Sequence, residues 1–106
     1  MECETLGRKQ NVLVRRQRLM PGQSSPWHTD PLHRFTTVLS GTEITIEFRD
    51  GGEKIAVPVH AGLCDWDVPE PRVHRAVNTG SEVYEEIVVF LLGDENDDPQ
   101  PVASTG

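Results

Sequence analysis

The sequence contains only two cysteines, Cys3 and Cys64, among its 106 residues. Two thiols are too few for the disulfide framework that holds together many small secreted domains. The sequence also lacks any apolar run near the ~20 residues that a membrane-spanning helix needs, and its first residues have neither the basic nor the apolar region of a signal sequence. We therefore expect reduced thiols, a cytoplasmic location and no membrane partner.

Positive charge is also scarce, with 10 Lys and Arg residues against 17 Asp and Glu residues and a net charge of −7. Four of the negative charges lie between residues 94 and 98, which leaves −3 on residues 1–93. Because the phosphates of nucleic acid would be repelled rather than neutralised, we exclude nucleic acid as a partner. Residues 93–106 carry too little apolar surface to offset their ordering entropy, and we expect a disordered acidic tail.

Helical signals are missing as well, because no segment combines a helical hydrophobic period with a cap. Short β-branched segments alternate instead with Gly, Pro, Asn and Asp turns, which predicts an all-β sandwich or barrel. In the segment 42–49, apolar and polar residues alternate, so we expect one buried face and one solvated face. Asp50-Gly-Gly52 then predicts a tight hairpin. The strands that we expect are 12–20, 35–39, 42–49, 54–59, 63–68, 73–77 and 82–92.

At this length the chain is expected to form one domain. Residues 1–11 are polar without a clear period and are expected to form an N-terminal arm or an edge strand. Residues 12–92 would form the barrel, and residues 93–106 the tail.

The residues of greatest chemical interest are His28, Asp30 and His74. His28 and Asp30 are two positions apart, so an extended backbone places both side chains on one face of the sheet. His74 follows a second proline-rich turn and begins a similar strand. Histidine and carboxylate side chains that meet in a pocket indicate a site.

The spacing around His28 resembles the first motif of the cupins, which reads Gly, five residues, His-any-His, three or four residues, Glu, six residues, Gly. Gly22, His28 and Gly41 match this motif. Asp30 stands at the position of the second His, and Arg34 at the position of the Glu.

The spacing around His74 resembles the second cupin motif, which reads Gly, five residues, Pro-any-Gly, two residues, His, three residues, Asn. Pro69, His74 and Asn78 match, while Pro71 replaces the second Gly and Gly62 lies one residue early. The resemblance covers about residues 12–92 and implies an all-β double-stranded β-helix, or jelly-roll, barrel. The layout is most similar to small single-domain bacterial cupins, including those named for β-alanine degradation. The family resemblance also implies a homodimer.

In cupins, the motif histidines and the Glu hold a divalent metal. The resemblance carries this role to His28, Asp30 and His74, a set of two imidazoles and one carboxylate that suits Fe(II), with Ni, Mn or Zn as alternatives. Since a guanidinium cannot ligate a cation, Arg34 fits in one of two ways. It binds a substrate carboxylate beside the metal, or it pairs with Asp30 in a barrel without metal.

These arrangements correspond to two functions for one cupin barrel. In the first, the protein is a metal-dependent enzyme of dioxygenase, isomerase or lyase type that acts on a small carboxylate or enolate-type metabolite, with oxygenase chemistry favoured. In the second, it is a non-catalytic module that binds a small anion and no metal. Fold alone does not choose between them.

Further residues near the motifs have alternative interpretations. His33 should face away from the pocket, although an irregular Pro31-Leu32 segment could turn it inward as a substitute ligand. Trp66 is interpreted either as a wall of the pocket that contacts substrate or as a core residue. If Trp66 faces the pocket, Asp65 and Asp67 on either side of it face outward and are solvated. Cys64 shares the face of Trp66, which favours a buried thiol. Glu85 and Glu86 lie on opposite strand faces and therefore cannot act as a catalytic pair.

Overall fold

The computed structural model describes residues 1–93, and this part of the chain consists of β-strands joined by turns, without a helix. The expected acidic tail lies outside the described residues, apart from Gly93. Within residues 1–93 no helix is long and apolar enough to cross a membrane. The strands are β1 Glu2–Lys9, β2 Val12–Leu19, β3 His28–Asp30, β4 Arg34–Ser40, β5 Glu43–Phe48, β6 Lys54–Pro58, β7 Cys64–Asp67, β8 Glu70–Asn78 and β9 Tyr84–Leu91.

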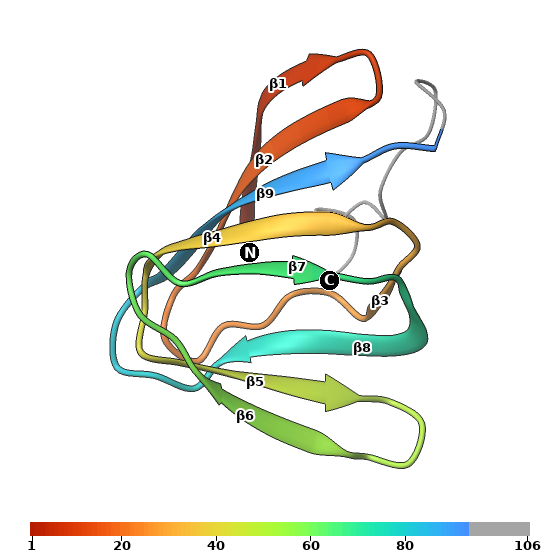
Figure 1. Ribbon diagram of the computed structural model, residues 1–106. Helices are drawn as coiled ribbons and strands as arrows, with labels where there is room; N and C mark the ends of the chain where they lie inside the picture. Colours follow the sequence, from red (N-terminus) through yellow and green to blue (C-terminus); the bar gives the residue numbers. More distant parts are fainter. Residues whose placement is uncertain (94–106) are drawn as a thin grey trace.

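The strands form two antiparallel sheets that face each other (Figure 1). One sheet has the order β1-β2-β9-β4-β7 and the other has the order β3-β8-β5-β6. Consecutive strands therefore often lie in different sheets, which produces a barrel-like sandwich with its inner side chains between the layers. The all-β prediction is confirmed. The segment 1–11 contains β1, which pairs with β2 at the edge of the five-stranded sheet.

The hydrophobic pattern explains how β5 is oriented. Ile44 and Phe48 are buried on its inner face, and Ile46 lies on the same face. β5 pairs with β6 through a hairpin whose turn glycines, Gly51 and Gly52, have φ values of 80° and 68°. These are left-handed conformations that glycine adopts at no steric cost.

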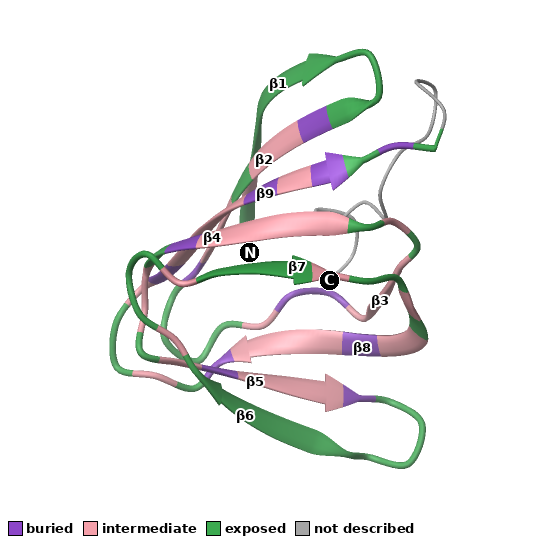
Figure 2. Ribbon diagram, in the orientation of Figure 1, coloured by how far each residue is buried: buried purple, intermediate pink, exposed green. Residues whose placement is uncertain are grey.

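The hydrophobic core is divided between the two ends of the barrel, and buried residues occur mainly on the central strands (Figure 2). One cluster contains Leu13, Val88, Phe90 and Leu92. The other contains Leu19, Val38, Ile44 and Tyr84. Between these clusters the inner face carries polar side chains, and a cavity of about 510 Å³ extends into the barrel.

Two residues that match the cupin motifs, Asn78 and Gly41, stabilise the backbone of the barrel. Asn78 is only 1% exposed. Its side-chain amide nitrogen donates hydrogen bonds to the carbonyl of Leu19 at 3.0 Å and to that of Glu82 at 2.8 Å. Its side-chain oxygen accepts a hydrogen bond from the backbone amide of Gly80 at 3.0 Å. Gly41 has a φ of 130°, and an added Cβ would lie 2.9 Å from the Tyr84 ring. These residues therefore fix turns of the barrel.

Candidate metal centre and cavity

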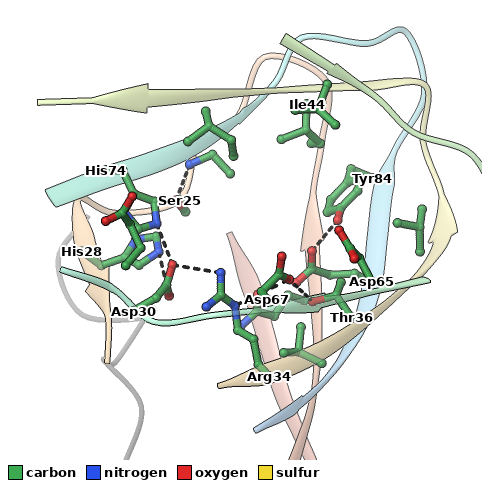
Figure 3. A pocket seen from close by; sticks show the side chains of 18 of the residues that line it. Ser25, His28, Asp30, Arg34, Thr36, Ile44, Asp65, Asp67, His74 and Tyr84 are labelled. Carbon is green, nitrogen blue, oxygen red and sulfur yellow. Dashed lines mark hydrogen bonds and ion pairs between the residues drawn. The ribbon is translucent and has the colours of Figure 1, made fainter. Parts of the chain in front are cut away.

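The short strand β3 brings His28 beside His74. The two residues are direct cross-strand partners of β3 and β8, and the register shifts between His28 and Asp30. The imidazole rings lie 4.7 Å apart between centroids. Asp30 points into the same cavity, as Figure 3 shows. The structure thus brings together the three residues that the sequence singles out.

The candidate ligand atoms of His28, Asp30 and His74 all lie within 4.8 Å of one another. The Nδ1 atoms of the two histidines face backbone carbonyls, that of Pro26 at 2.7 Å and that of Arg72 at 2.8 Å. Both Nε2 atoms are therefore directed to Asp30, at 3.5 Å from Oδ1 for His28 and 2.6 Å from Oδ2 for His74. A backbone acceptor at one ring nitrogen is the usual way in which proteins orient a metal-binding histidine.

Charge interactions link His28, Asp30 and His74 with Arg34. Burial alone would raise the pKa of Asp30, but the hydrogen bond from His74 and the charge of Arg34 outweigh it and hold that pKa below its usual value. The same hydrogen bond raises the pKa of His74, with burial acting against it. A protonated His74 donates to Asp30, whereas a neutral His74 with its proton on Nδ1 presents a free Nε2 lone pair.

Arg34 enters the cavity from β4, in the opposite sheet. Its Nη2 atom lies 3.2 Å from Asp30 Oδ2, and its Nε atom lies 4.0 Å from Asp67 Oδ2. Its Nη1 atom is buried without a hydrogen-bond partner among the described residues. Buried polar atoms are normally satisfied, so this N–H is available to donate a hydrogen bond to an acceptor in the cavity.

A second polar group lies on the five-stranded sheet. The hydroxyl of Tyr84 donates to Glu86, and the hydroxyl of Thr36 donates to Asp67 at 3.1 Å. Burial raises the pKa of Glu86 to about 7, although the hydrogen bond from Tyr84 and the charge of Arg34 lower it. Burial also raises the pKa of Asp67, against the opposing effects of Arg34 and Thr36. The two walls of the cavity thus carry different chemistry.

The inner and outer faces of β7 are the reverse of the prediction. Asp65 and Asp67 line the cavity, while Trp66 is 62% exposed and packs against Phe35 on the outside, with ring centroids 4.9 Å apart. Cys64 is exposed, so the prediction of a buried thiol is wrong. The interpretation of Trp66 as a substrate-binding wall is corrected as well, because alternation along β7 turns the two acids into the cavity and the Trp66 ring outward, against Phe35.

His33 is exposed and is not among the residues that line the cavity, which removes it as a substitute ligand. The backbone carbonyl of His33 accepts a hydrogen bond from the Leu91 amide, and this bond holds the chain around His33 against the end of β9. Glu86 was missed as a cavity residue. The signal was present in the sequence, because Glu86 alternates in step with the apolar Tyr84, Val88 and Phe90 and therefore shares their inner face.

No family model and no curated protein matches this sequence. Among solved structures, a cupin domain from Bordetella pertussis Tohama I has a TM-score of 0.73 over 85% of this chain and 91% of that chain, at 16% identity. The chain has the cupin fold. A conserved protein with a double-stranded β-helix domain from Klebsiella pneumoniae gives a TM-score of 0.63 at 25% identity, over 90% of this chain and 79% of that chain.

The same cupin barrel occurs in enzymes. A structure described as a DMSP lyase has a TM-score of 0.59 at 18% identity, over 87% of this chain and 44% of that chain. These likenesses establish the double-stranded β-helix and not an activity, because the cupin fold supports more than one chemistry. The function of this chain must therefore be argued from the side chains in its cavity.

Proposed function

We propose that this cupin holds a divalent metal with His28, Asp30 and His74 and acts on a small carboxylate or enolate-type metabolite. The observation that carries the proposal is the orientation of the two imidazoles. Each places Nδ1 against a backbone carbonyl and directs Nε2 to Asp30. The donor set fits a divalent ion of the Fe(II) type, and Ni, Mn and Zn fit it as well. When bound, such an ion supplies Lewis acidity or a position for O2.

Arg34 supports the choice of substrate class. Its guanidinium reaches the candidate centre from the opposite sheet and has an unsatisfied N–H in the cavity. A carboxylate matches a guanidinium in both charge and geometry. Arg34 would therefore hold the carboxylate of the substrate beside the metal ligands, and the inner face of the barrel would exclude water from the rest of the molecule.

A second candidate function rests on one distance. Arg34 Nη2 lies 3.2 Å from Asp30 Oδ2, which is the direct pair expected in a barrel without metal. In that case His74 stays protonated, Asp30 is neutralised by its neighbours, and the cavity binds a small anion without catalysis. This arrangement uses the same residues in another protonation state.

Metal titration separates the two functions. Protein prepared without a polyhistidine tag is titrated anaerobically with Fe(II), Mn(II), Ni(II) and Zn(II), and retained metal is measured after desalting. The first function predicts close to one equivalent of at least one metal. Retention of less than about 0.2 equivalents of each of the four metals would contradict the first function. Binding of a small dicarboxylate such as malonate by the same preparation would then support the second function.

We also propose that the outer face of the five-stranded sheet mediates a homodimer. Trp66, Phe35, Val89 and Val14 are successive cross-strand neighbours on this face. Trp66 and nearby Leu91 are 62% and 41% exposed. An apolar row across four strands can supply the centre of an interface, which for a stable dimer buries about 1,600 Å² in total.

Replacing Trp66 by Asp should convert the dimer into a monomer, because a charge at the centre of an apolar interface must be desolvated without a partner. The oligomeric state is measured by light scattering coupled to gel filtration at several concentrations. Ile55→Asp is the matched control, since Ile55 is 44% exposed but lies in the other sheet. A wild-type protein that is monomeric at every concentration would refute the proposed dimer.

A further inference from the structure

Glu86 occupies a position in the cavity that the proposed metal site does not use. It lies on β9, in the central part of the five-stranded sheet, and it lines the cavity together with Tyr84 and Val88. The candidate metal ligands belong to β3 and β8 in the opposite sheet. A molecule bound between the sheets would therefore have the His28, Asp30 and His74 cluster on one side and the Glu86 carboxyl group on the other.

The surroundings of Glu86 favour a carboxyl group that exchanges protons near neutral pH. Tyr84 on the same strand is its hydrogen-bond donor. The charged and titratable groups that act on Glu86 or share its part of the cavity come from four other strands: Cys3 on β1, Asp30 on β3, Arg34 on β4, and Asp65 and Asp67 on β7. Burial raises the pKa of Glu86 to about 7, and Asp67 and Asp30 act in the same direction.

Tyr84 serves as a positioning residue for this carboxyl group. Burial and the neighbouring Glu86 raise the pKa of the Tyr84 phenol well above its usual value. The phenol therefore keeps its proton and remains a donor at any working pH. A fixed donor at one carboxyl oxygen orients the carboxyl group and leaves the other oxygen available to a ligand.

We propose that Glu86 is the catalytic acid–base residue of the cavity and transfers a proton at the carbon next to a carbonyl or carboxylate group of the substrate. The inference deepens the proposed function, because it relies on Arg34 to hold the substrate carboxylate. The C–H bond breaks, its proton goes to Glu86, and its electron pair is delocalised as an enolate whose negative charge faces Arg34. Return of the proton to the same carbon gives exchange, and return to a neighbouring atom gives an isomer.

This step needs no oxidant or reductant and has no leaving group, so it assigns the cavity to proton-transfer chemistry of the isomerase type rather than to oxygenation. The substrate class is a small 2-oxo or 3-oxo acid, because the carbonyl group makes its neighbouring C–H bond acidic.

Hydrogen exchange into simple oxo acids tests the inference. Pyruvate, 2-oxobutyrate and acetoacetate are incubated in D2O with metal-loaded protein, and loss of the C–H signal is followed by proton NMR. We expect wild-type protein to accelerate exchange of at least one probe, and Glu86→Gln to lower that rate by about 100-fold or more. Glu85→Gln is the matched control, because Glu85 is the next residue, pairs with Arg18 and does not line the cavity.

Infrared titration of metal-free protein gives a readout that does not depend on turnover. The stretch of a protonated carboxyl group should disappear as the pH rises through about 7, and it should be missing in Glu86→Gln. Tyr84→Phe should move this titration, and the pH profile of exchange, to higher pH, because the hydrogen bond that lowers the pKa of Glu86 is lost.

The possible failures are distinguishable. Wild-type protein that binds metal but accelerates exchange of none of the three probes overturns the inference and leaves the metal site standing. Exchange that persists in Glu86→Gln, or a carboxyl group that still titrates near pH 7 in that variant, overturns it as well. Exchange that is lost in Glu86→Gln but requires no metal supports Glu86 and contradicts the metal part of the proposed function.

Discussion

If His28, Asp30 and His74 hold a divalent metal as proposed, we expect replacement of His74 by Ala to lower metal binding to background. The substitution removes one of the two imidazoles that converge on Asp30 and also the partner that lies 2.6 Å from Asp30 Oδ2. Even residues that only orient metal ligands are typically worth about 10- to 100-fold in affinity, so loss of a direct ligand should cost more than about 100-fold. Retained metal after desalting and calorimetric titration both measure this loss.

His33→Ala is the matched control for that experiment. His33 is exposed outside the cavity, so its removal should leave the metal stoichiometry and affinity unchanged. Circular dichroism checks that His74→Ala keeps its β-structure, since Asp30 retains Arg34 as a neighbour in the variant. If His74→Ala binds metal as tightly as wild-type protein, the ion is held elsewhere and the proposed centre is wrong.

Replacing Asn78 by Asp should destabilise the protein by about 3 kcal/mol or more, because each buried polar group left without a partner costs about 1–3 kcal/mol. The two side chains have nearly the same shape, but Asp lacks the amide N–H groups that reach the Leu19 and Glu82 carbonyls. A carboxylate would face two carbonyl oxygens at a position that is only 1% exposed. Urea denaturation followed by fluorescence measures the change in the free energy of unfolding.

The matched control is Asn11→Asp. Asn11 is exposed, and its side chain makes one long hydrogen bond of 3.4 Å to the Leu92 carbonyl. A change of less than about 0.5 kcal/mol is expected there, as for most surface substitutions. If Asn78→Asp is as stable as Asn11→Asp, then the hydrogen bonds of Asn78 do not hold the end of β8 in place.

The sequence was a good guide to the barrel because its strongest signals are local. Alternation in β5 and the Asp50-Gly-Gly52 turn depend only on side-chain period and backbone conformation, and both behave as predicted. Gly41 and Asn78, which match the cupin motifs, also determine local backbone structure: Gly41 adopts a positive φ, and the Asn78 side chain binds a backbone carbonyl. The motif matches therefore indicated the fold even though Asp30 and Arg34 depart from the usual metal-binding residues.

The cavity was harder to predict because its inner wall breaks the rule that polar side chains face water. In β7 the rule assigned Trp66 to the inside and the two acids to the outside, and the structure has the opposite arrangement. The position of Glu86 follows from its strand period, but its raised pKa depends on burial and on neighbours from other strands. These interactions join residues far apart in the sequence, so a pattern within one strand cannot reveal them.

The orientation of β7 also has an evolutionary consequence. The turn before it is held by hydrogen bonds from the Gly62 amide to the Val38 carbonyl at 2.8 Å and from the Val38 amide to the Leu63 carbonyl at 2.8 Å. Because side chains alternate with a period of two, deleting one residue from this turn would exchange the faces of β7. Cys64 and Trp66 would then enter the cavity in place of Asp65 and Asp67. One deletion could thus convert an acidic wall of the cavity into an aromatic one without altering any residue of the strand.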